Sequence, residues 1–146
     1  LMIHDIDIVM HCLFSDRMNI FARGCEDVAA VLGSCEGATV YLSASRKASK
    51  KIRMIHIEQE DMTIQGDFMT QEIYVYRKPG QYSIDNQRYI QENIVEKVQV
   101  AKQEPLRTEL STFLACVRDN KPFPITPEQA LLNLCICEDI RKEMNI

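Results

Sequence analysis

The sequence predicts an α+β domain, in which helices pack on one face of an open, mostly antiparallel β-sheet. From residue 18 to residue 100, apolar and polar side chains alternate in short runs rich in β-branched and aromatic residues, a pattern typical of strands. Helical spacing of apolar residues occurs before and after this region. Short turns link most of the predicted strands, which favours antiparallel pairing with the helices gathered on one face.

The first 13 residues predict a helix with two different sides. Its apolar side holds Ile3, Ile6, Val9, Met10 and Leu13, and its polar side holds His4, Asp7 and His11. The polar side either faces solvent or lines a reactive site. We interpret His11 as structural, because it lies two turns from His4, roughly 10 Å along the axis. The helix lacks a capping residue at its start, so we expect the natural chain to extend upstream.

The middle region predicts seven strands, at residues 19–23, 28–33, 38–45, 52–58, 62–68, 73–76 and 97–101. Two helices follow them. The first opens with Pro105, and its apolar face carries Leu106, Leu110, Phe113, Leu114 and Val117. The second opens with Thr126 as a cap, Pro127 in the first turn and Gln129 as a capping-box partner.

The sheet face that the helices leave uncovered is expected to carry aromatic residues and small hydroxyls rather than charges. Tyr41 with Ser43, and Tyr74 with Tyr76, alternate with Leu42, Ile73 and Val75. Aromatic residues are enriched in subunit interfaces and charged residues are depleted there, so this face is a candidate interface. The alternative is a set of scattered exposed aromatics.

The segment 79–96 is long, polar and without clear periodicity, and its large side chains are Tyr82, Tyr89 and Ile90. We interpret it as a loop. A loop of this length in a compact domain is usually functional or disordered, so it would cover a substrate cleft or reach a neighbouring subunit.

A basic segment stands out from an otherwise acidic chain. Arg46, Lys47, Lys50, Lys51 and Arg53 place five positive charges within eight residues. Recognition of a phosphate or diphosphate needs several convergent donors with positive charge, so this segment is a candidate anion site. The alternative is a solvated basic hairpin.

Length and composition agree with a single domain over residues 1–146. With 46% hydrophobic residues, a chain of 146 residues can bury roughly two-thirds of its unfolded surface. The net charge of -4 argues against a nucleic-acid partner. No apolar run approaches the ~20 residues of a membrane span, and the start lacks the features of a signal peptide, so we expect a cytoplasmic protein.

The cysteines predict reduced, buried thiols. Cys12, Cys25, Cys35, Cys116, Cys135 and Cys137 lie mostly in apolar segments. Cys135 and Cys137 would diverge by about 200° on a helix, which is poor geometry for a shared metal. We therefore expect no metal site.

Several segments, in order along the chain, resemble the second domain of the glucose-fructose oxidoreductase and inositol dehydrogenase family (Gfo/Idh/MocA). These segments are His4–Asp7 before an apolar run, Lys51–Arg53, Thr70–Tyr74 as an edge-of-sheet segment, Glu104–Leu110 with Phe113 and Leu114, and Pro122–Glu128. Members of the family are NAD(P)-dependent enzymes that act on sugars and sugar nucleotides. The Lys-Ile-Arg at residues 51–53 is similar to members that act on nucleotide-linked sugars, with the sugar-nucleotide 3-dehydrogenases as the nearest type.

The resemblance implies the fold and role of a C-terminal domain like that of glyceraldehyde-3-phosphate dehydrogenase, which binds substrate and forms a homodimer or homotetramer through its sheet face. It implies hydride transfer to or from a sugar carbon, with His4 in the acid/base role. An imidazole with an ordinary pKa near 6.5 can exchange a proton at neutral pH. Asp7 would contact the substrate and orient His4, or it would only cap local structure. Arg46, Lys51 and Arg53 would bind the substrate.

The sequence also departs from the family pattern. Ser45 and Arg46 stand where related members tend to have Asn-Trp, and Glu58–Asp61 replaces a Gly-containing turn. No GxGxxG occurs, so the NAD or NADP would be held by an N-terminal Rossmann domain, absent from this chain. We expect this chain alone neither to bind NAD(P) nor to catalyse.

Two rival interpretations come from other classes. One is a stand-alone, non-catalytic dimerisation or binding module of the same fold, which would need neither His4 nor the basic segment. The other is a small metal-binding protein that uses His4, Asp7 and a cysteine, which would require the ligands to converge within about 2 Å of one ion.

Overall fold

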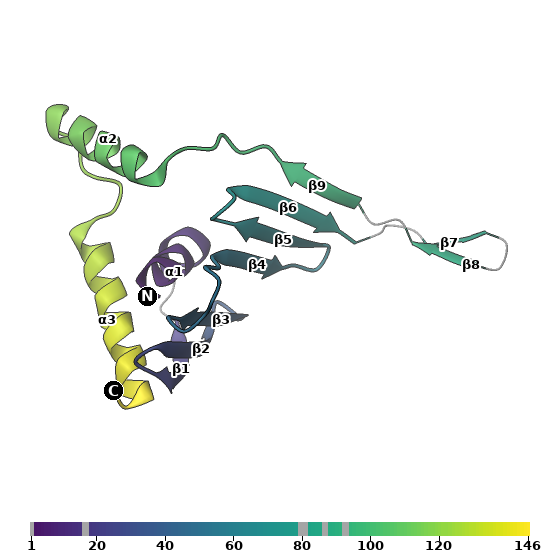
Figure 1. The fold of residues 1–146 in the computed structure, drawn as a ribbon, viewed down its shortest axis with the longest axis horizontal. Helices are drawn as coiled ribbons and strands as arrows, with labels where there is room; N and C mark the ends of the chain where they lie inside the picture. The colour runs from purple at the N-terminus through teal and green to yellow at the C-terminus, as the bar shows by residue number, and fades with distance from the viewer. Residues whose placement is uncertain (1, 16–17, 79–81, 86–87, 92–93) are drawn as a thin grey trace. The chain divides into compact units, whose positions relative to one another are not determined.

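The computed structural model describes residues 2–15, 18–78, 82–85, 88–91 and 94–146. The chain forms two compact units (Figure 1). Unit 1 consists of Leu1–Ser49 and Glu109–Ile146, and unit 2 consists of Lys50–Thr108. Both units contain antiparallel β-sheet, and the helices lie before and after the strands in the chain. The predicted α+β class is confirmed, whereas the single-domain organisation stays a prediction.

The sheet of unit 1 is a meander of three antiparallel strands, in the order β1-β2-β3. The strands are β1 (Asn19–Cys25), β2 (Val28–Cys35) and β3 (Ala38–Ser45). Two-residue turns join them, since Cys25 pairs with Val28 and Cys35 pairs with Ala38. In the second turn Glu36 and Gly37 both have positive φ, 50° and 81°. Such backbone values match the right-handed twist of a tight hairpin.

Helices cover one face of this sheet. They are α1 (Ile3–Ile8), which continues as the π-helix η1 (Val9–Leu13), and α3 (Pro127–Met144). Helix α3 packs on β1 and on α1. The core between them contains Ile6 from α1, Val31 from β2 and Ile136 from α3, each 2% exposed or less. Alternation along the strands directs small and branched residues inward, as the sequence predicts.

Helix α2 (Pro105–Arg118) and helix α3 begin as predicted. Each has a proline in its first turn, preceded by a capping residue. Glu104 accepts hydrogen bonds from the backbone N–H groups of Leu106 and Arg107, at 3.3 and 2.6 Å. Thr126 and Gln129 form a reciprocal capping box. Caps of this kind each stabilise a helix by about 1 kcal/mol.

Unit 2 contains a four-stranded antiparallel sheet and a separate hairpin. The sheet has the order β4-β5-β6-β9, with β4 (Met54–Glu58), β5 (Met62–Asp67), β6 (Glu72–Arg77) and β9 (Ile94–Val98). The hairpin pairs β7 (Tyr82–Asp85) with β8 (Arg88–Gln91).

Three predictions about unit 2 are wrong. The segment 79–96 is not a loop, because it contains β7, β8 and the start of β9; residues 79–81, 86–87 and 92–93 lie outside the described part. The last strand ends at Val98 rather than at residue 101. The segment 70–74 does not form a sheet edge, because β6 lies between β5 and β9. Strand β9 follows the hairpin and pairs with β6. The backbone N–H and C=O groups that β6 would leave unpaired at a sheet edge are therefore hydrogen-bonded to β9.

The two faces of the unit 2 sheet differ in polarity. One face carries Ile55, Ile57, Ile64, Ile73, Val75 and Val98. The opposite face carries Tyr74 and Tyr76, as predicted, but also His56, Glu72 and Lys97. The expectation of an uncharged face is therefore wrong for this sheet. Strand β6 itself supplies Glu72, whereas His56 comes from β4 and Lys97 from β9, and the alternation of Tyr74 and Tyr76 did not reveal these residues.

Candidate substrate-binding and acid/base site

The predicted polar side of the first helical segment, His4 and Asp7 of α1 and His11 of η1, lies in two different environments. His4 is exposed, near the start of the helix. Asp7 and His11 are partly buried, with side-chain exposures of 28% and 15%, and both contact helix α3. Of the three residues, His4 is therefore open to solvent, whereas Asp7 and His11 connect the first helical segment to α3.

Asn133 of α3 connects Asp7 and His11. Its Nδ2 donates a hydrogen bond to Oδ1 of Asp7 at 2.6 Å, and its Oδ1 lies 3.1 Å from Nε2 of His11. The same Nε2 is 3.9 Å from Oδ1 of Asp7. Asn133 is 4% exposed, so its polar atoms have little access to water. These contacts give His11 a partner on α3, and its structural interpretation stays a prediction.

The chemistry of the three side chains fixes their hydrogen-bond roles. An ionised carboxylate only accepts, so the amide nitrogen of Asn133 faces Asp7 and its carbonyl oxygen faces His11. His11 must then donate through Nε2–H. Each of the three groups thus determines the orientation of the next.

His11 belongs to the π-helix η1, which follows α1 without a break. This π-helix ends where the backbone N–H of Phe14 donates to the carbonyl of Val9 at 3.0 Å. Short π-helical turns within helices are frequently found at functional sites. Here the turn follows the candidate site residues by only a few positions.

The basic segment is shared between the two units. Arg46 and Lys47 belong to unit 1 and contact the β1–β2 turn, where Nη1 of Arg46 lies 3.5 Å from the carbonyl oxygen of Glu26. Nζ of Lys47 lies 3.5 Å from a carboxylate oxygen of Asp27. Lys51 and Arg53 belong to unit 2 and are exposed. The convergence of these charges on one anion stays a prediction.

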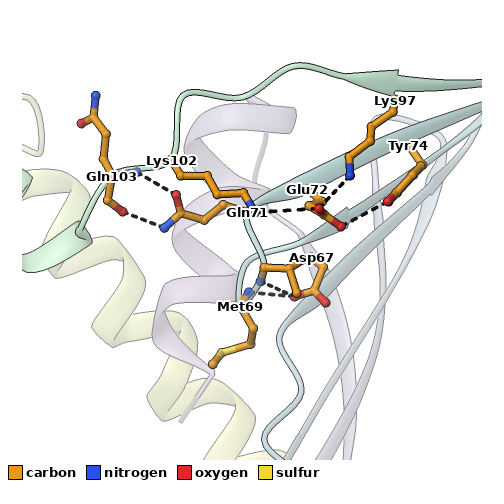
Figure 2. A network of polar contacts seen from close by, with 9 residues as sticks. Asp67, Met69, Gln71, Glu72, Tyr74, Lys97, Lys102 and Gln103 are labelled. Atoms are coloured by element: carbon orange, nitrogen blue, oxygen red, sulfur yellow. Dashed lines mark hydrogen bonds and ion pairs between the residues drawn. The ribbon is translucent and has the colours of Figure 1, made fainter.

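Figure 2 shows a polar cluster in unit 2, centred on Glu72. One carboxylate oxygen of Glu72 accepts from Nζ of Lys97 at 2.7 Å and lies 3.8 Å from Nζ of Lys102. The other accepts from the Tyr74 hydroxyl at 3.1 Å. Nζ of Lys97 also lies 5.3 Å from the centre of the Tyr74 ring. Sequence analysis did not find this cluster, because its members come from two strands and a later segment.

These contacts alter the proton affinity of both charged partners. The hydrogen bond from Lys97, followed by that from Tyr74, lowers the pKa of Glu72 below its usual range. The hydrogen bond to Glu72, followed by that to Tyr74, raises the pKa of Lys97. The cluster therefore favours the ionised pair at neutral pH.

A second contact in Figure 2 attaches the segment after β9 to the β5–β6 turn. The side-chain amide of Gln71 donates to the carbonyl of Gln103 at 2.7 Å and accepts from its N–H at 2.9 Å. Gln71 has φ of 55°. Asp67 supports the same turn by accepting from the N–H groups of Met69 and Thr70.

The outer face of β1, β2 and β3 carries a row of large apolar residues. Phe21 pairs with Leu32, and Leu32 pairs with Tyr41, so the three side chains cross the sheet in register. They are 53%, 52% and 66% exposed. Tyr41 and Ser43 lie on this face, opposite the helices, as predicted. We call Phe21, Leu32 and Tyr41 the outer row.

The prediction of buried thiols is mostly wrong. Cys35 is buried, but Cys116 and Cys137 are half-buried, and Cys12, Cys25 and Cys135 are exposed. The apolar segments that contain them are amphipathic, so one side of each faces solvent. Partial burial raises the pKa of the Cys137 thiol. In the described part of the chain, no group of three His, Cys, Asp or Glu side chains is arranged to hold a metal ion.

Sequence reasoning also missed Asn133, although a signal was present. The buried residues of α3 are Asn133, Ile136, Ile140 and Met144, at helical spacing. A lone amide in phase with a buried apolar stripe predicts a specific polar partner, because burying an amide without one is costly. The partner cannot be named from the sequence, since it lies more than 120 positions away.

No protein-family model and no curated protein matches the chain. Comparison with solved structures shows the class of fold, an α+β domain similar to part of a solved enzyme. Two crystal forms of UDP-N-acetylglucosamine 3-dehydrogenase GnnA from Acidithiobacillus ferrooxidans are similar to it, with TM-scores of 0.80 and 0.78 and 22% sequence identity in each case. The alignments cover 99% of this chain but only 46% and 45% of the enzyme. The chain thus spans less than half the length of these similar proteins.

Within the described residues, none of the helices is both long and apolar enough to cross a membrane.

Proposed function

We propose that this chain is the substrate-binding domain of a Gfo/Idh/MocA-type NAD(P)-dependent oxidoreductase that acts on a sugar or a nucleotide-linked sugar. The observation that carries the proposal is the likeness over 99% of the chain to part of a UDP-N-acetylglucosamine 3-dehydrogenase. The ordered motifs at His4–Asp7 and Lys51–Arg53 support it independently.

His4 is the proposed acid/base group. Its imidazole is exposed on α1, one turn before Asp7, so a sugar hydroxyl can approach it. During oxidation the hydroxyl proton would pass to the imidazole as the hydride leaves the carbon, and reduction would reverse both transfers. A positioned acid/base group accelerates such a step by roughly 10²- to 10⁴-fold.

The residues described here do not fit a dinucleotide cofactor. A Rossmann site needs parallel strands and a Gly-rich turn that leads into a helix. The paired strands in the described part of this chain are antiparallel, and the sequence has no GxGxxG. NAD or NADP would therefore bind to a further domain, and this chain would supply substrate contacts and proton transfer.

Asp7 and the basic segment would hold the substrate. Asp7 can accept a hydrogen bond from a sugar hydroxyl. Arg46, Lys51 and Arg53 supply guanidinium and ammonium donors of the kind that bind a diphosphate. Because Ser45 and Arg46 stand where related members tend to have Asn-Trp, the assay below includes several nucleotide sugars.

We also propose a cytoplasmic homodimer or homotetramer that forms through the outer face of the sheet. The outer row exposes one phenylalanine, one leucine and one tyrosine side by side. Burying such a side chain stabilises an assembly by about 1.5–3 kcal/mol. A stand-alone binding module is the second candidate, and the same exposed row favours it because the row needs no catalytic residue.

The test is a cofactor-linked assay of the natural full-length protein with UDP-N-acetylglucosamine and other nucleotide sugars, which follows NAD(P)H by absorbance. We expect turnover, and we expect His4→Ala to lower kcat by roughly 10²-fold or more. The control is His56→Ala, which removes an exposed histidine of β4 that contacts Glu58. Turnover that is unaffected by His4→Ala would contradict the assigned role, and absence of any turnover would favour the binding module.

A further inference from the structure

We infer that Asn133 is a positioning residue for the active site, acting through Asp7. This inference rests on the proposed function. It assigns to helix α3 a role in the chemistry, although α3 lies at the other end of the chain from the site residues. The juxtaposition that carries it is the contact of buried Asn133 with partly buried Asp7 and His11.

Asp7 is held at one carboxylate oxygen. Both contacts, with Nδ2 of Asn133 at 2.6 Å and with Nε2 of His11 at 3.9 Å, involve Oδ1. A carboxylate has a second oxygen that accepts hydrogen bonds, and the Asp7 side chain is 28% exposed. Asp7 is therefore fixed from the side of α3 while it can still accept a hydrogen bond from a substrate hydroxyl.

The same contact fixes the helix that carries His4. His4 and Asp7 are three residues apart on α1, so they lie on one helical face. Asn133 limits the rotation of α1 about its axis, because rotation would break its bonds to both Asp7 and His11. A small error in the placement of a reacting group can reduce the rate by roughly 10²-fold.

An apolar residue would fill the place of Asn133 more simply if packing were its only role. The adjacent buried positions of α3 are Ile136 and Ile140, and a leucine would continue that stripe. The Asn133 amide requires an acceptor for its N–H and a donor for its oxygen. The fold supplies the acceptor, Asp7, from α1 and the donor, His11, from η1. Buried polar groups whose hydrogen bonds are all satisfied can specify one arrangement of two packed helices.

The experiment compares four forms of the full-length enzyme in one assay: wild type, Asn133→Leu, Ile136→Val, and the exchange variant Asp7→Asn/Asn133→Asp. Ile136→Val is the matched control, because it perturbs the same buried stripe without touching the polar contact. Thermal unfolding of each form reports folding. KM values for the sugar nucleotide and for NAD(P) are measured separately.

We expect Asn133→Leu to lower kcat/KM for the sugar nucleotide by roughly tenfold to 10²-fold, with the KM for NAD(P) unchanged. Ile136→Val should change kcat/KM by less than about threefold at a similar loss of thermal stability. The exchange variant keeps the hydrogen bonds between the helices but moves the carboxylate to α3. Its thermal stability should recover relative to Asn133→Leu, whereas its turnover should not.

Recovery of turnover together with stability in the exchange variant would show a purely structural role and overturn the inference. Equal effects of Asn133→Leu and Ile136→Val would overturn it as well. His4→Ala is measured alongside. If wild type is active and His4→Ala is not, a failure at Asn133 concerns this inference alone, whereas an inactive wild type refutes the proposed function itself.

Discussion

Glu72 shows how single residues in unit 2 combine charge and hydrogen bonding. It is contacted by two lysines and one tyrosine, and all of these groups are near the surface. Exposed ion pairs are usually worth little, since water and salt screen them. The pKa shifts of Glu72 and Lys97 nevertheless give the contact a measurable signature, because they link folding to proton binding.

The first prediction concerns acid sensitivity. Because the pKa of folded Glu72 is lowered, its contribution is present above the unfolded glutamate value of about 4.3 and is lost as pH falls toward the folded value. The free energy of unfolding of wild type should therefore fall more steeply in acid than that of Glu72→Gln. Denaturant unfolding at neutral pH and at about pH 3 measures the difference.

The control for this prediction removes the partner instead. Lys97→Met should weaken the acid sensitivity in the same direction, because Glu72 then loses the main cause of its lowered pKa. An acid dependence that is identical in wild type and both variants would contradict the assignment.

Among single residues, the sequence identified His4, Asp7 and His11 as one stripe, because helical spacing is local information. It did not separate exposed His4 from the two residues that contact α3, because the separation depends on Asn133, a distant residue. The cysteines were misjudged for a related reason. An apolar neighbourhood in the sequence does not say which side of an amphipathic element a thiol occupies.

At the scale of elements, local signals located the helix starts and the first three strands well. Pro105 and the group Thr126, Pro127 and Gln129 act on the turn where they occur, so both helices begin where predicted. The hairpin was not identified, and β9 (Ile94–Val98) was predicted three residues too late, at 97–101. Their polar residues lack an alternating pattern. The pairing of β9 with β6 is also not local, because the β7–β8 hairpin separates the two strands in the sequence.

The second prediction compares two glycines of the unit 1 hairpins. Gly24 has φ of 155°, and a Cβ there would lie 2.0 Å from the carbonyl oxygen of Val28. Gly37 has φ of 81°, but a Cβ there would meet nothing within 4 Å among the described residues. Gly24→Ala should destabilise by roughly 3 kcal/mol through backbone overlap. Gly37→Ala should cost about 1–2 kcal/mol through conformational strain alone.

Chemical denaturation of the two alanine variants tests this order. The two substitutions are chemically identical and lie at the two hairpins that share β2, so the larger loss expected for Gly24→Ala reports mainly the overlap with Val28. A smaller loss for Gly24→Ala than for Gly37→Ala would mean that the β1–β2 turn relaxes to accommodate the methyl group.

At the scale of the whole molecule, the α+β class follows from the sequence because strand and helix patterns occupy separate stretches. The division into two compact units does not follow. The boundaries fall at residues 49–50 and 108–109, and the second lies inside α2, where the sequence shows a continuous helical pattern. Such a boundary depends on which contacts the helix makes, and spacing along the chain does not record them.

The third prediction concerns assembly. Replacing Leu32 of the outer row by Glu should dissociate the proposed oligomer, because it places a charge at the centre of the apolar surface. The matched control is Leu134→Glu on α3, since the two leucines are 52% and 53% exposed. Sedimentation velocity should give a multiple of the monomer mass for wild type and for Leu134→Glu, and the monomer mass for Leu32→Glu.

An unchanged mass in Leu32→Glu would contradict assembly through this face. A monomeric wild type would leave the outer row as an exposed apolar surface of the single chain and would favour contact with a different protein.

The contact between Gln71 and Gln103 has a consequence for hydrogen exchange. A side-chain amide here takes the place of a neighbouring strand, since it both donates to and accepts from the backbone of Gln103. We therefore expect the N–H of Gln103 to be protected from deuterium although it lies beyond the last residue of β9. Its exchange should slow to the rate of the β5–β6 turn, and Gln71→Ala should release it. The lead-in to α2 would then open and close together with the sheet, as one cooperative unit.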